Sequence, residues 1–126
     1  MIQQQTILKV SDNSGAKTVK CIKVLGGYKK KFAKLGNVIV VSIQKLRNKS
    51  KSTSKVNKGD VCKALVLRTK KPFNIKDGSN IIFQENSVCL INKQNKLIGT
   101  RIIGPLPKIL KKGKFNKFTS ISSGFI

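Results

Sequence analysis

Residues 63–91 read KALVLRTKKPFNIKDGSNIIFQENSVCLI and contain two apolar runs separated by a polar, turn-rich centre. The runs, residues 64–67 and 88–91, have the length and aliphatic character of buried strands. Between them, Asp77 and Gly78 are a strong hairpin signal, because a type I′ turn needs positive φ at both central residues. We therefore predict a hairpin whose base belongs to the core and whose ribbon, about residues 68–83, protrudes from it.

The two arms of this ribbon differ in chemical character. The incoming arm is basic and carries four cations: Arg68, Lys70, Lys71 and Lys76. The outgoing arm, residues 81–83, is apolar. A ribbon that is anchored at its base and basic along its length is suited to lie on a negatively charged surface.

Three further stretches have the pattern of short strands, residues 6–10, 18–25 and 38–43, and the first apolar run extends to a strand over residues 61–68. Turns rich in Gly, Asn and Asp separate them, and no helix-length amphipathic segment intervenes, which argues against a parallel βαβ fold. Strands at this spacing predict a mainly β fold, a small closed or nearly closed barrel over about residues 1–104. The alternation within residues 18–25 is impure, and a bulge or a barrel-corner bend would reconcile it.

The C-terminal part of the chain carries different signals. Residues 97–104 are apolar with glycines at both bends, which predicts close packing of the backbone. Pro105 and Pro107 before a short apolar and basic segment, with Gly113 after it, predict one short helix.

The final residues give weaker signals. Residues 115–121 predict a second helical or irregular segment, and residues 122–126 read as a loose tail. We therefore expect short C-terminal helices over about residues 105–121. The length, 126 residues, predicts a single domain spanning the chain.

The charge balance indicates a polyanionic partner. The chain has 27 Lys and Arg against 4 Asp and Glu, no His, and a formal net charge of +23. The cations are interleaved with the predicted strands, so the surface of the domain itself is the expected binding surface. Nucleic acid is the first candidate partner. An anionic membrane is the second, but it would require a basic amphipathic helix or a signal sequence, and neither is present.

The inventory of reactive side chains argues against catalysis. Turn formation explains Asp12, Asp60 and Asp77, and Glu85 is expected to pair with a nearby Lys. No phosphate-binding loop of the G-x-x-x-x-G-K type occurs. We predict that the protein is not an enzyme and uses no cofactor.

The cysteines and the ends of the chain carry no sign of a metal site, export or a membrane span. Cys21, Cys62 and Cys89 lack C-x-x-C spacing and lie in apolar runs, so we interpret them as small buried residues in a reducing compartment. No run of about 18 apolar residues occurs. The first residues resemble no signal or transit peptide, so we expect the protein to work where it is made.

Two loops are candidates for direct contact with a polyanion. In residues 28–34, Tyr28 and Phe32 stand among lysines and either stack on bases or sugars or, as we favour, pin the loop onto the barrel. Residues 44–57 are a low-complexity Lys/Ser/Asn segment that buries almost nothing. It is either a solvated loop or, as we favour, an arm that orders on a phosphate backbone.

Several motifs resemble a known family, the universal large-subunit ribosomal protein fourteen. They are MIQQQT at residues 1–6, VSDNSGA at 10–16, CIKVLGG at 21–27, KGDV at 58–61, ALVLRTKK at 64–71, DGS at 77–79, FQEN at 83–86 and IGTRIIGP at 98–105. The segment 115–120 is similar as well. The resemblance covers nearly the whole chain in one order.

The resemblance implies a five-stranded barrel with a protruding ribbon and small C-terminal helices. It also implies binding to large-subunit rRNA, contact with neighbouring large-subunit proteins, an intersubunit bridge to small-subunit rRNA and a surface for a ribosome-silencing factor. A free single-stranded RNA-binding protein or chaperone of the OB type is the alternative, and it would need an aromatic platform on one sheet face.

We expect cations of the ribbon and loops to neutralise rRNA phosphates. The expected large-subunit RNA contacts are Lys17, Lys20, Lys23, Lys29, Lys30, Lys31, Arg68, Lys70, Lys71, Lys76 and Arg101. The expected bridge face consists of Arg47, Lys49, Lys51, Lys108, Lys111 and Lys112.

The composition favours one cellular location over others. The chain is rich in Lys, Asn and Ile, which indicates an AT-rich genome, and its segment 47–55 looks longer and richer in Lys and Ser than in bacterial members. We expect a ribosome of the mitochondrion, with the bacterial cytoplasm and the plastid as alternatives.

Overall fold

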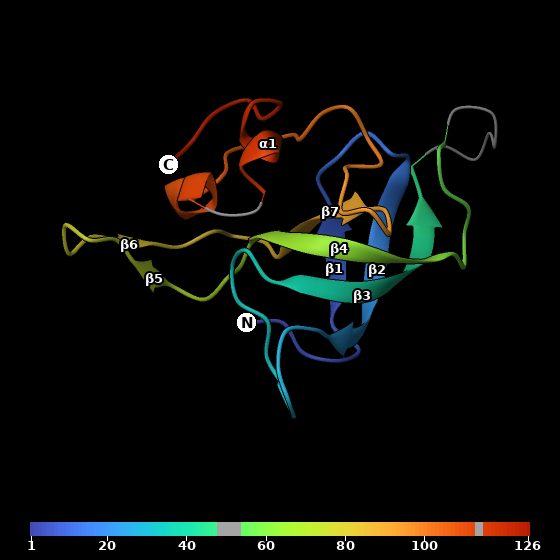
Figure 1. Cartoon of the computed structure of the whole chain (residues 1–126), viewed down its shortest axis with the longest axis horizontal. Helices are drawn as coiled ribbons and strands as arrows, with labels where there is room; N and C mark the ends of the chain where they lie inside the picture. The colour runs from blue at the N-terminus through green and yellow to red at the C-terminus, as the bar shows by residue number, and fades with distance from the viewer. Residues whose placement is uncertain (48–53, 113–114) are drawn as a thin grey trace.

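The computed structural model describes residues 1–47, 54–112 and 115–126. Five strands form a closed barrel: β1 (Ile7–Val10), β2 (Ala16–Val24), β3 (Val38–Leu46), β4 (Val61–Arg68) and β7 (Ser87–Ile91). Two short strands, β5 (Phe73–Asn74) and β6 (Asn80–Ile81), form a separate ribbon. The C-terminal elements are the 3₁₀-helix η1 (Lys108–Lys112) and the α-helix α1 (Asn116–Thr119). Figure 1 shows the ribbon extending away from the barrel. The mainly β fold and its barrel are confirmed.

The barrel closes through a parallel contact between its first and last strands. The strand order is β1-β2-β3-β4-β7, and each sequential pair is antiparallel. β1 then pairs with β7 in parallel, with Lys9 opposite Ser87 and Val10 opposite Val88. Closure leaves the long strands without an open edge, which protects them from pairing with other chains.

Irregular pairing in β2 explains its impure alternation. Its register against β3 shifts between Cys21 and Lys23 and again around Thr18. As a result Val19, Cys21 and Val24 all point into the barrel although they do not alternate strictly. Of the two predicted alternatives, a bulge or a barrel-corner bend, the register shifts support the bulge, and Lys17 and Lys23 are exposed on the outside.

The described residues form two hydrophobic clusters, one on each side of β4 and β7. The first fills the barrel and includes Leu8, Val41 and Val88. In the second, the outer faces of β4 and β7 pack against residues of the C-terminal segment, namely Ile102, Leu106, Leu110 and Phe118. Burial on both faces explains why these two strands are continuous apolar runs in the sequence.

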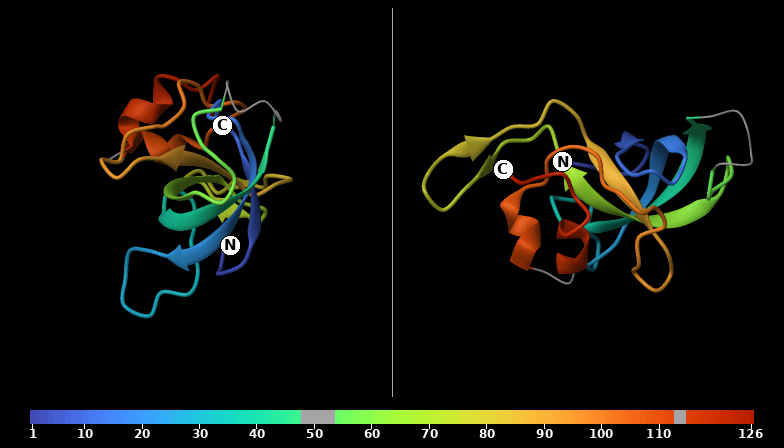
Figure 2. Two further views of the ribbon diagram at one scale, coloured as in Figure 1. Left: turned by 90° about the vertical axis from the view of Figure 1, so that its right-hand side faces the viewer. Right: turned by 90° about the horizontal axis from the view of Figure 1, so that it is seen from above.

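The C-terminal segment differs from expectation in two ways. The predicted first helix is a 3₁₀-helix, η1, whose Leu110 N–H donates to the carbonyl of Pro107 at 3.1 Å. The prediction of a loose tail is wrong. The N–H of Ile126 donates to the carbonyl of Leu106 at 2.9 Å, and the carbonyl of Ile126 accepts from Lys108 N–H at 3.1 Å. Figure 2 shows this segment folded back beside the barrel.

Close backbone packing in residues 97–104 is confirmed. A Cβ placed on Gly99 would lie 2.5 Å from Asn13 Oδ1. That same oxygen accepts hydrogen bonds from the N–H groups of Thr100 at 2.6 Å and Arg101 at 3.1 Å. The β1–β2 turn is thus held against this segment through one amide side chain.

The ribbon turn is one residue longer than the predicted turn. The carbonyl of Ile75 accepts from Gly78 N–H at 3.0 Å, and Ile75 N–H donates to Ser79 at 2.8 Å. Gly78 has φ +89°, whereas Asp77 does not adopt positive φ. The two-residue type I′ turn is therefore wrong. The pattern is that of a three-residue loop with a bulge at Gly78, in which only the glycine needs the left-handed conformation.

Candidate nucleic-acid interface

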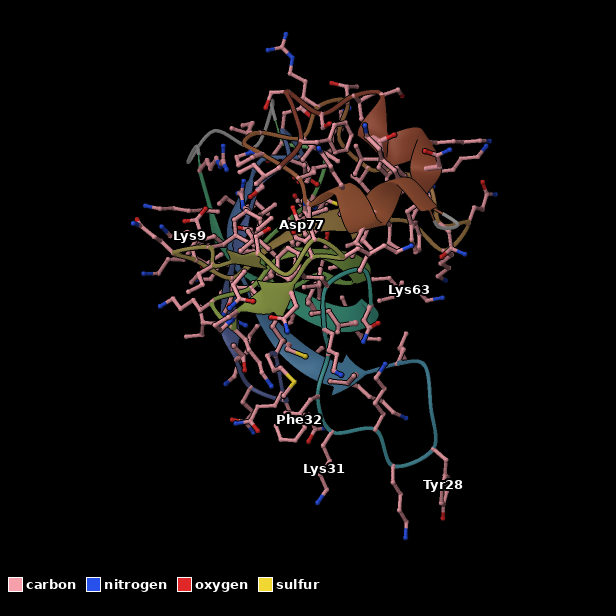
Figure 3. All side chains as sticks on the ribbon, turned by 90° about the vertical axis from the view of Figure 1, so that its left-hand side faces the viewer. Lys9, Tyr28, Lys31, Phe32, Lys63 and Asp77 are labelled. Atoms are coloured by element: carbon pink, nitrogen blue, oxygen red, sulfur yellow. The ribbon has the colours of Figure 1, made fainter. Side chains whose placement is uncertain are left out.

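The loop between β2 and β3, residues 25–37, carries its aromatic side chains on the outside. The Tyr28 side chain is 92% exposed and Phe32 is 47% exposed. Figure 3 shows Tyr28 at the outer end of the loop, pointing away from the barrel. The expectation that both rings pin the loop to the barrel is therefore wrong. Ala33, which is fully buried, provides the attachment through a two-way backbone bridge with Ile2.

The three consecutive lysines of this loop are not equivalent. Lys29 and Lys31 are exposed, whereas Lys30 is half-buried. With its amide oriented to accept, Asn37 takes a hydrogen bond from Lys30 Nζ at 2.8 Å and from Lys34 N–H at 3.0 Å. Lys30 thus braces the loop, while its two neighbours are free to meet a phosphate.

The loop and the N-terminal residues enclose a cleft that sequence reasoning missed. It measures about 820 Å³ and lies between residues 3–5 and residues 27–31, with Lys23 on its lining. Three consecutive glutamines form the N-terminal side. The glutamine triplet ahead of β1 is visible in the sequence, but its position across the cleft from Tyr28 follows only from the fold.

A second hollow lies at the other end of β1 and β2. It measures about 470 Å³ and is lined by Lys9, Lys17 and Arg47 together with Arg68 and Glu85. The Arg47 guanidinium donates to the carbonyl of Val10 at 2.6 Å, which fixes the end of β3. Lys9, another cation that sequence reasoning missed, therefore joins three predicted ones here: Lys17, Arg47 and Arg68. Lys20, in the middle of β2, is half-buried.

The ribbon presents its cations to solvent and packs its aromatic rings together. Lys70, Lys71 and Lys76 are exposed. Phe73 and Phe83 from the two arms stack with ring centroids 6.1 Å apart, and Phe83 is 8% exposed. The ribbon is therefore a stiffened platform with a basic rim.

Asp77 at the ribbon tip has a local role. Its Oδ1 accepts from the Ser79 N–H at 2.9 Å and from the Ser79 hydroxyl at 2.6 Å. These two bonds hold the pKa of Asp77 below its ordinary value, because they favour the carboxylate. The aspartate therefore shapes the turn, as expected from the sequence.

Arg68 occupies a different environment from the other predicted RNA contacts. It is only 7% exposed, at the root of the ribbon. Its guanidinium donates hydrogen bonds to Ser11, Glu85 and Ser87 and to the carbonyls of Ile103 and Pro105. Burial lowers the pKa of Arg68, while the charge of Glu85 opposes that shift. This arrangement argues against phosphate binding by Arg68 and makes it a residue that ties β4, β7 and the C-terminal segment together.

Asp60 and Asp77 accept hydrogen bonds within their own turns, whereas Glu85 and Asp12 make contacts between distant parts of the chain. Lys9 Nζ lies 2.9 Å from Glu85, which confirms the expected pairing of this acid with a lysine. Asp12 is fully buried, accepts from Ser14 N–H at 3.1 Å and also accepts from the Leu90 N–H at 2.9 Å. Asp12 thus does more than form a turn, because it also joins β1 to β7.

The predicted bridge residues do not form one patch. Figure 1 shows the end of β3, where Arg47 follows, and η1 on opposite sides of the molecule. Lys108 and Lys111 are exposed on η1, and Lys111 Nζ lies 4.2 Å from the centroid of the Phe125 ring. Lys112 ends η1, and Lys49 and Lys51 lie outside the described residues.

Arg101, a predicted large-subunit contact, is exposed beside the β1–β2 turn.

The thiols are arranged as structural residues. Cys21 and Cys89 are buried, Cys62 is half-buried, and all three are free. Burial raises the pKa of each thiol, that of Cys62 to about 11, so the thiolate form is suppressed. In the described ranges no three His, Cys, Asp or Glu side chains gather as a metal site. Within those same ranges, the helices are too short and too polar to cross a bilayer.

The sequence of the chain was also compared with those of known protein families. The family model described as ribosomal protein L14p/L23e matches residues 1–126, the whole chain.

Proposed function

The chain belongs to the ribosomal protein L14p/L23e family, structural and non-enzymatic constituents of the large ribosomal subunit, and we propose that it attaches to large-subunit rRNA through unpaired cations on three surfaces. These surfaces are the loop 25–37 with the outer face of β2, the exposed rim of the ribbon, and the segment around Arg101. The proposed contacts are Lys17, Lys20, Lys23, Lys29, Lys31, Lys70, Lys71, Lys76 and Arg101, with Lys30 bracing the loop.

The observation that carries this proposal is the lack of internal charge neutralisation. Within the described residues there are two ion pairs, and both use the same carboxylate, Glu85. Asp12 is buried and Asp77 is occupied by its own turn. The cations on the surface therefore need an external polyanion, and the rRNA backbone supplies one. Contacts with phosphates contribute affinity and fix the position of the protein on the RNA, but they do not discriminate between base sequences.

The experiment that tests attachment is a sucrose-gradient profile of native lysate at low and high salt, with and without dissociation of the subunits. We expect the protein to follow the large subunit and to stay with it after a high-salt wash. A protein that runs free, or that leaves at moderate salt, would instead favour the single-stranded RNA-binding alternative, to which the exposed ring of Tyr28 lends some support.

We also propose that residues 47–55 contribute to an intersubunit bridge with small-subunit rRNA. The ends of this segment are tied to the barrel, because Arg47 N–H donates to Gly15 at 2.8 Å and Lys55 N–H donates to Ser14 at 2.9 Å. Replacing Lys49 and Lys51 by Gln spares both attachments. We expect this double variant to weaken subunit joining more than attachment to the large subunit, as read from the ratio of joined to free subunits. An equal loss of both would contradict the bridge.

The cations of η1 form a separate proposed contact. Lys108, Lys111 and Lys112 lie away from the β3 end, and the neighbouring Ile109 is 60% exposed. A basic surface with an exposed apolar side chain suits a neighbouring large-subunit protein or a ribosome-silencing factor. Cross-linking from a photoreactive group at Ile109 in assembled subunits tests this assignment, with Ile82 as the exposed control position.

The cellular location proposed from composition is the mitochondrion. Fractionation of cells followed by detection of the protein in mitochondrial or other ribosomes tests it directly. Recovery in plastid or bacterial cytoplasmic ribosomes would replace the location and leave the proposed attachment to rRNA unchanged.

A further inference from the structure

The cleft beside Tyr28 has fixed walls. Next in the chain to its lining residues, Ile2 N–H donates to the carbonyl of Ala33 at 3.1 Å and Ala33 N–H donates back to the carbonyl of Ile2 at 2.7 Å, and both residues are fully buried. On the N-terminal side Gln5 N–H donates to Cys21 of β2 at 2.7 Å. Both walls are therefore attached to the barrel and to each other. A ligand entering the cleft does not have to order them, which lowers the cost of binding.

Tyr28 is an unused aromatic surface at the rim of this cleft. Its 92% exposure means that the ring contributes almost nothing to the core. Lys29 Nζ stands 5.4 Å from the ring centroid, and most of the ring remains open. An exposed ring among cations is the arrangement that stacks on a nucleic-acid base, because every base offers a π-face.

The remaining lining residues match the other parts of a nucleotide. Lys23, Lys29 and Lys31 are exposed around the cleft and can meet the phosphates that flank a base. The amides of residues 3–5 both donate and accept hydrogen bonds, as base edges require. The lining, all of it within the described part of the chain, includes no carboxylate. The chemistry is that of an anionic ligand with a flat aromatic ring.

We propose that this cleft binds one unpaired nucleotide of RNA, with its base stacked on Tyr28 and its flanking phosphates on Lys23, Lys29 and Lys31. The inference rests on the proposed attachment to rRNA and names the form of RNA taken at this surface. A base within a duplex already has both faces stacked, so the cleft selects a loop, a bulge or a strand end.

The composition of the chain supplies a specific reporter. Tyr28 is the only tyrosine and there is no tryptophan, so tyrosine emission reports on this ring alone. We would titrate the full-length protein with a short single-stranded oligoribonucleotide, with an abasic oligomer of equal length and charge, and with the paired duplex. The expected result is saturable quenching by the single strand and little quenching by the other two. Equal quenching by all three would overturn base stacking.

Variants separate stacking from charge. Tyr28→Ala should weaken binding of a labelled single strand by about tenfold, as expected for the loss of one stacked base. Its salt dependence should stay unchanged, because no charge is removed. Tyr28→Phe should keep the affinity, and Ile82→Ala, which removes a 64% exposed side chain on the ribbon side, serves as the control. Wild-type affinity in Tyr28→Ala would overturn the proposal.

The same variants keep this inference distinct from the proposed function. If wild-type protein follows the large subunit in gradients while Tyr28→Ala binds single strands normally, the nucleotide cleft is wrong and rRNA attachment stands. If wild-type protein does not follow the large subunit, the proposed function fails whatever Tyr28 does. If the duplex binds and the single strand does not, the surface recognises the duplex backbone, and the proposal of a cleft for an unpaired nucleotide is wrong.

Discussion

The loop 25–37 and the ribbon that carries β5 and β6 both place aromatic residues near lysines, yet they use their rings in opposite ways. In the ribbon, pairing of β5 with β6 brings Phe73 against Phe83, and the rings stabilise the projection. In the loop no paired strand faces Tyr28, and its ring stays in solvent. The comparison shows that a cross-strand partner determines whether an aromatic residue beside lysines supports the structure or remains available for a ligand.

The largest expected effect is at the root of the ribbon. Arg68→Ala would leave Ser11, Ser87 and two backbone carbonyls without their shared donor. We expect a loss of about 3 kcal/mol in the free energy of unfolding, measured by urea denaturation, because buried polar groups without partners are costly. Lys70→Ala, two residues along and exposed, should change it by less than about 0.5 kcal/mol. Similar losses of unfolding free energy for Arg68→Ala and Lys70→Ala would contradict the structural role assigned to Arg68.

A smaller loss is expected at Gly104, which packs against Arg68. This glycine has φ +88°, and a Cβ there would collide with the guanidinium. Gly104→Ala should cost about 2 kcal/mol in thermal or urea unfolding, from backbone strain together with displacement of Arg68. Gly59 has the same φ and nothing within 4 Å, so Gly59→Ala measures the strain alone. Equal losses at the two sites would show that Arg68 moves without cost.

The third prediction compares the two kinds of ring directly. Phe83→Ala should lower the free energy of unfolding by about 1–2 kcal/mol, since it removes a buried ring and with it the stacking contact to Phe73. Tyr28→Ala should change it by less than about 0.5 kcal/mol, because its ring is in solvent. A large loss at Tyr28 would mean that the loop depends on its ring as the ribbon does.

The smallest expected effect concerns pH. The hydrogen bond from Lys9 holds the pKa of Glu85 below its ordinary value of 4.5, assisted by Ser87 and the charge of Arg68. Because the folded-state pKa is lower than the unfolded one, this contribution is present above about pH 4.5 and is lost as pH falls through the folded-state value. The carboxylate is 36% exposed, so the contribution should stay below about 1 kcal/mol. Glu85→Gln should flatten this part of the stability profile in urea unfolding between pH 3 and 6, and an unchanged profile would exclude Glu85 as its source.

The barrel could be predicted from the sequence because its signals are local. The bounds of β4 agree with those expected from the pattern, and the impure alternation of β2 correctly indicated a bulge. The tail 122–126 could not be predicted, because its bonds to Leu106 and Lys108 depend on how the preceding segment folds back. Short apolar runs identify strands, whereas they do not identify what packs on a strand's outer face.

The candidate interface was predictable in its chemistry and less so in its members. Composition is enough to predict a polyanion as partner, since only four acids oppose 27 cations. It does not separate Arg68, which is buried, from Lys70, which is exposed two positions later. It also does not place residues 3–5 opposite Tyr28, because that proximity comes from the bridge between Ile2 and Ala33.

The burial of β4 and β7 on both faces has a consequence for synthesis of the protein. The barrel strands are complete at Ile91, but their outer cover comes from residues 102–126, which are synthesised after them. During translation, Leu65, Leu67 and Cys89 therefore stay uncovered after the barrel can close. A nascent chain in this interval exposes an apolar face on a strongly basic body, and we expect chaperones to bind that face until residues 102–126 emerge.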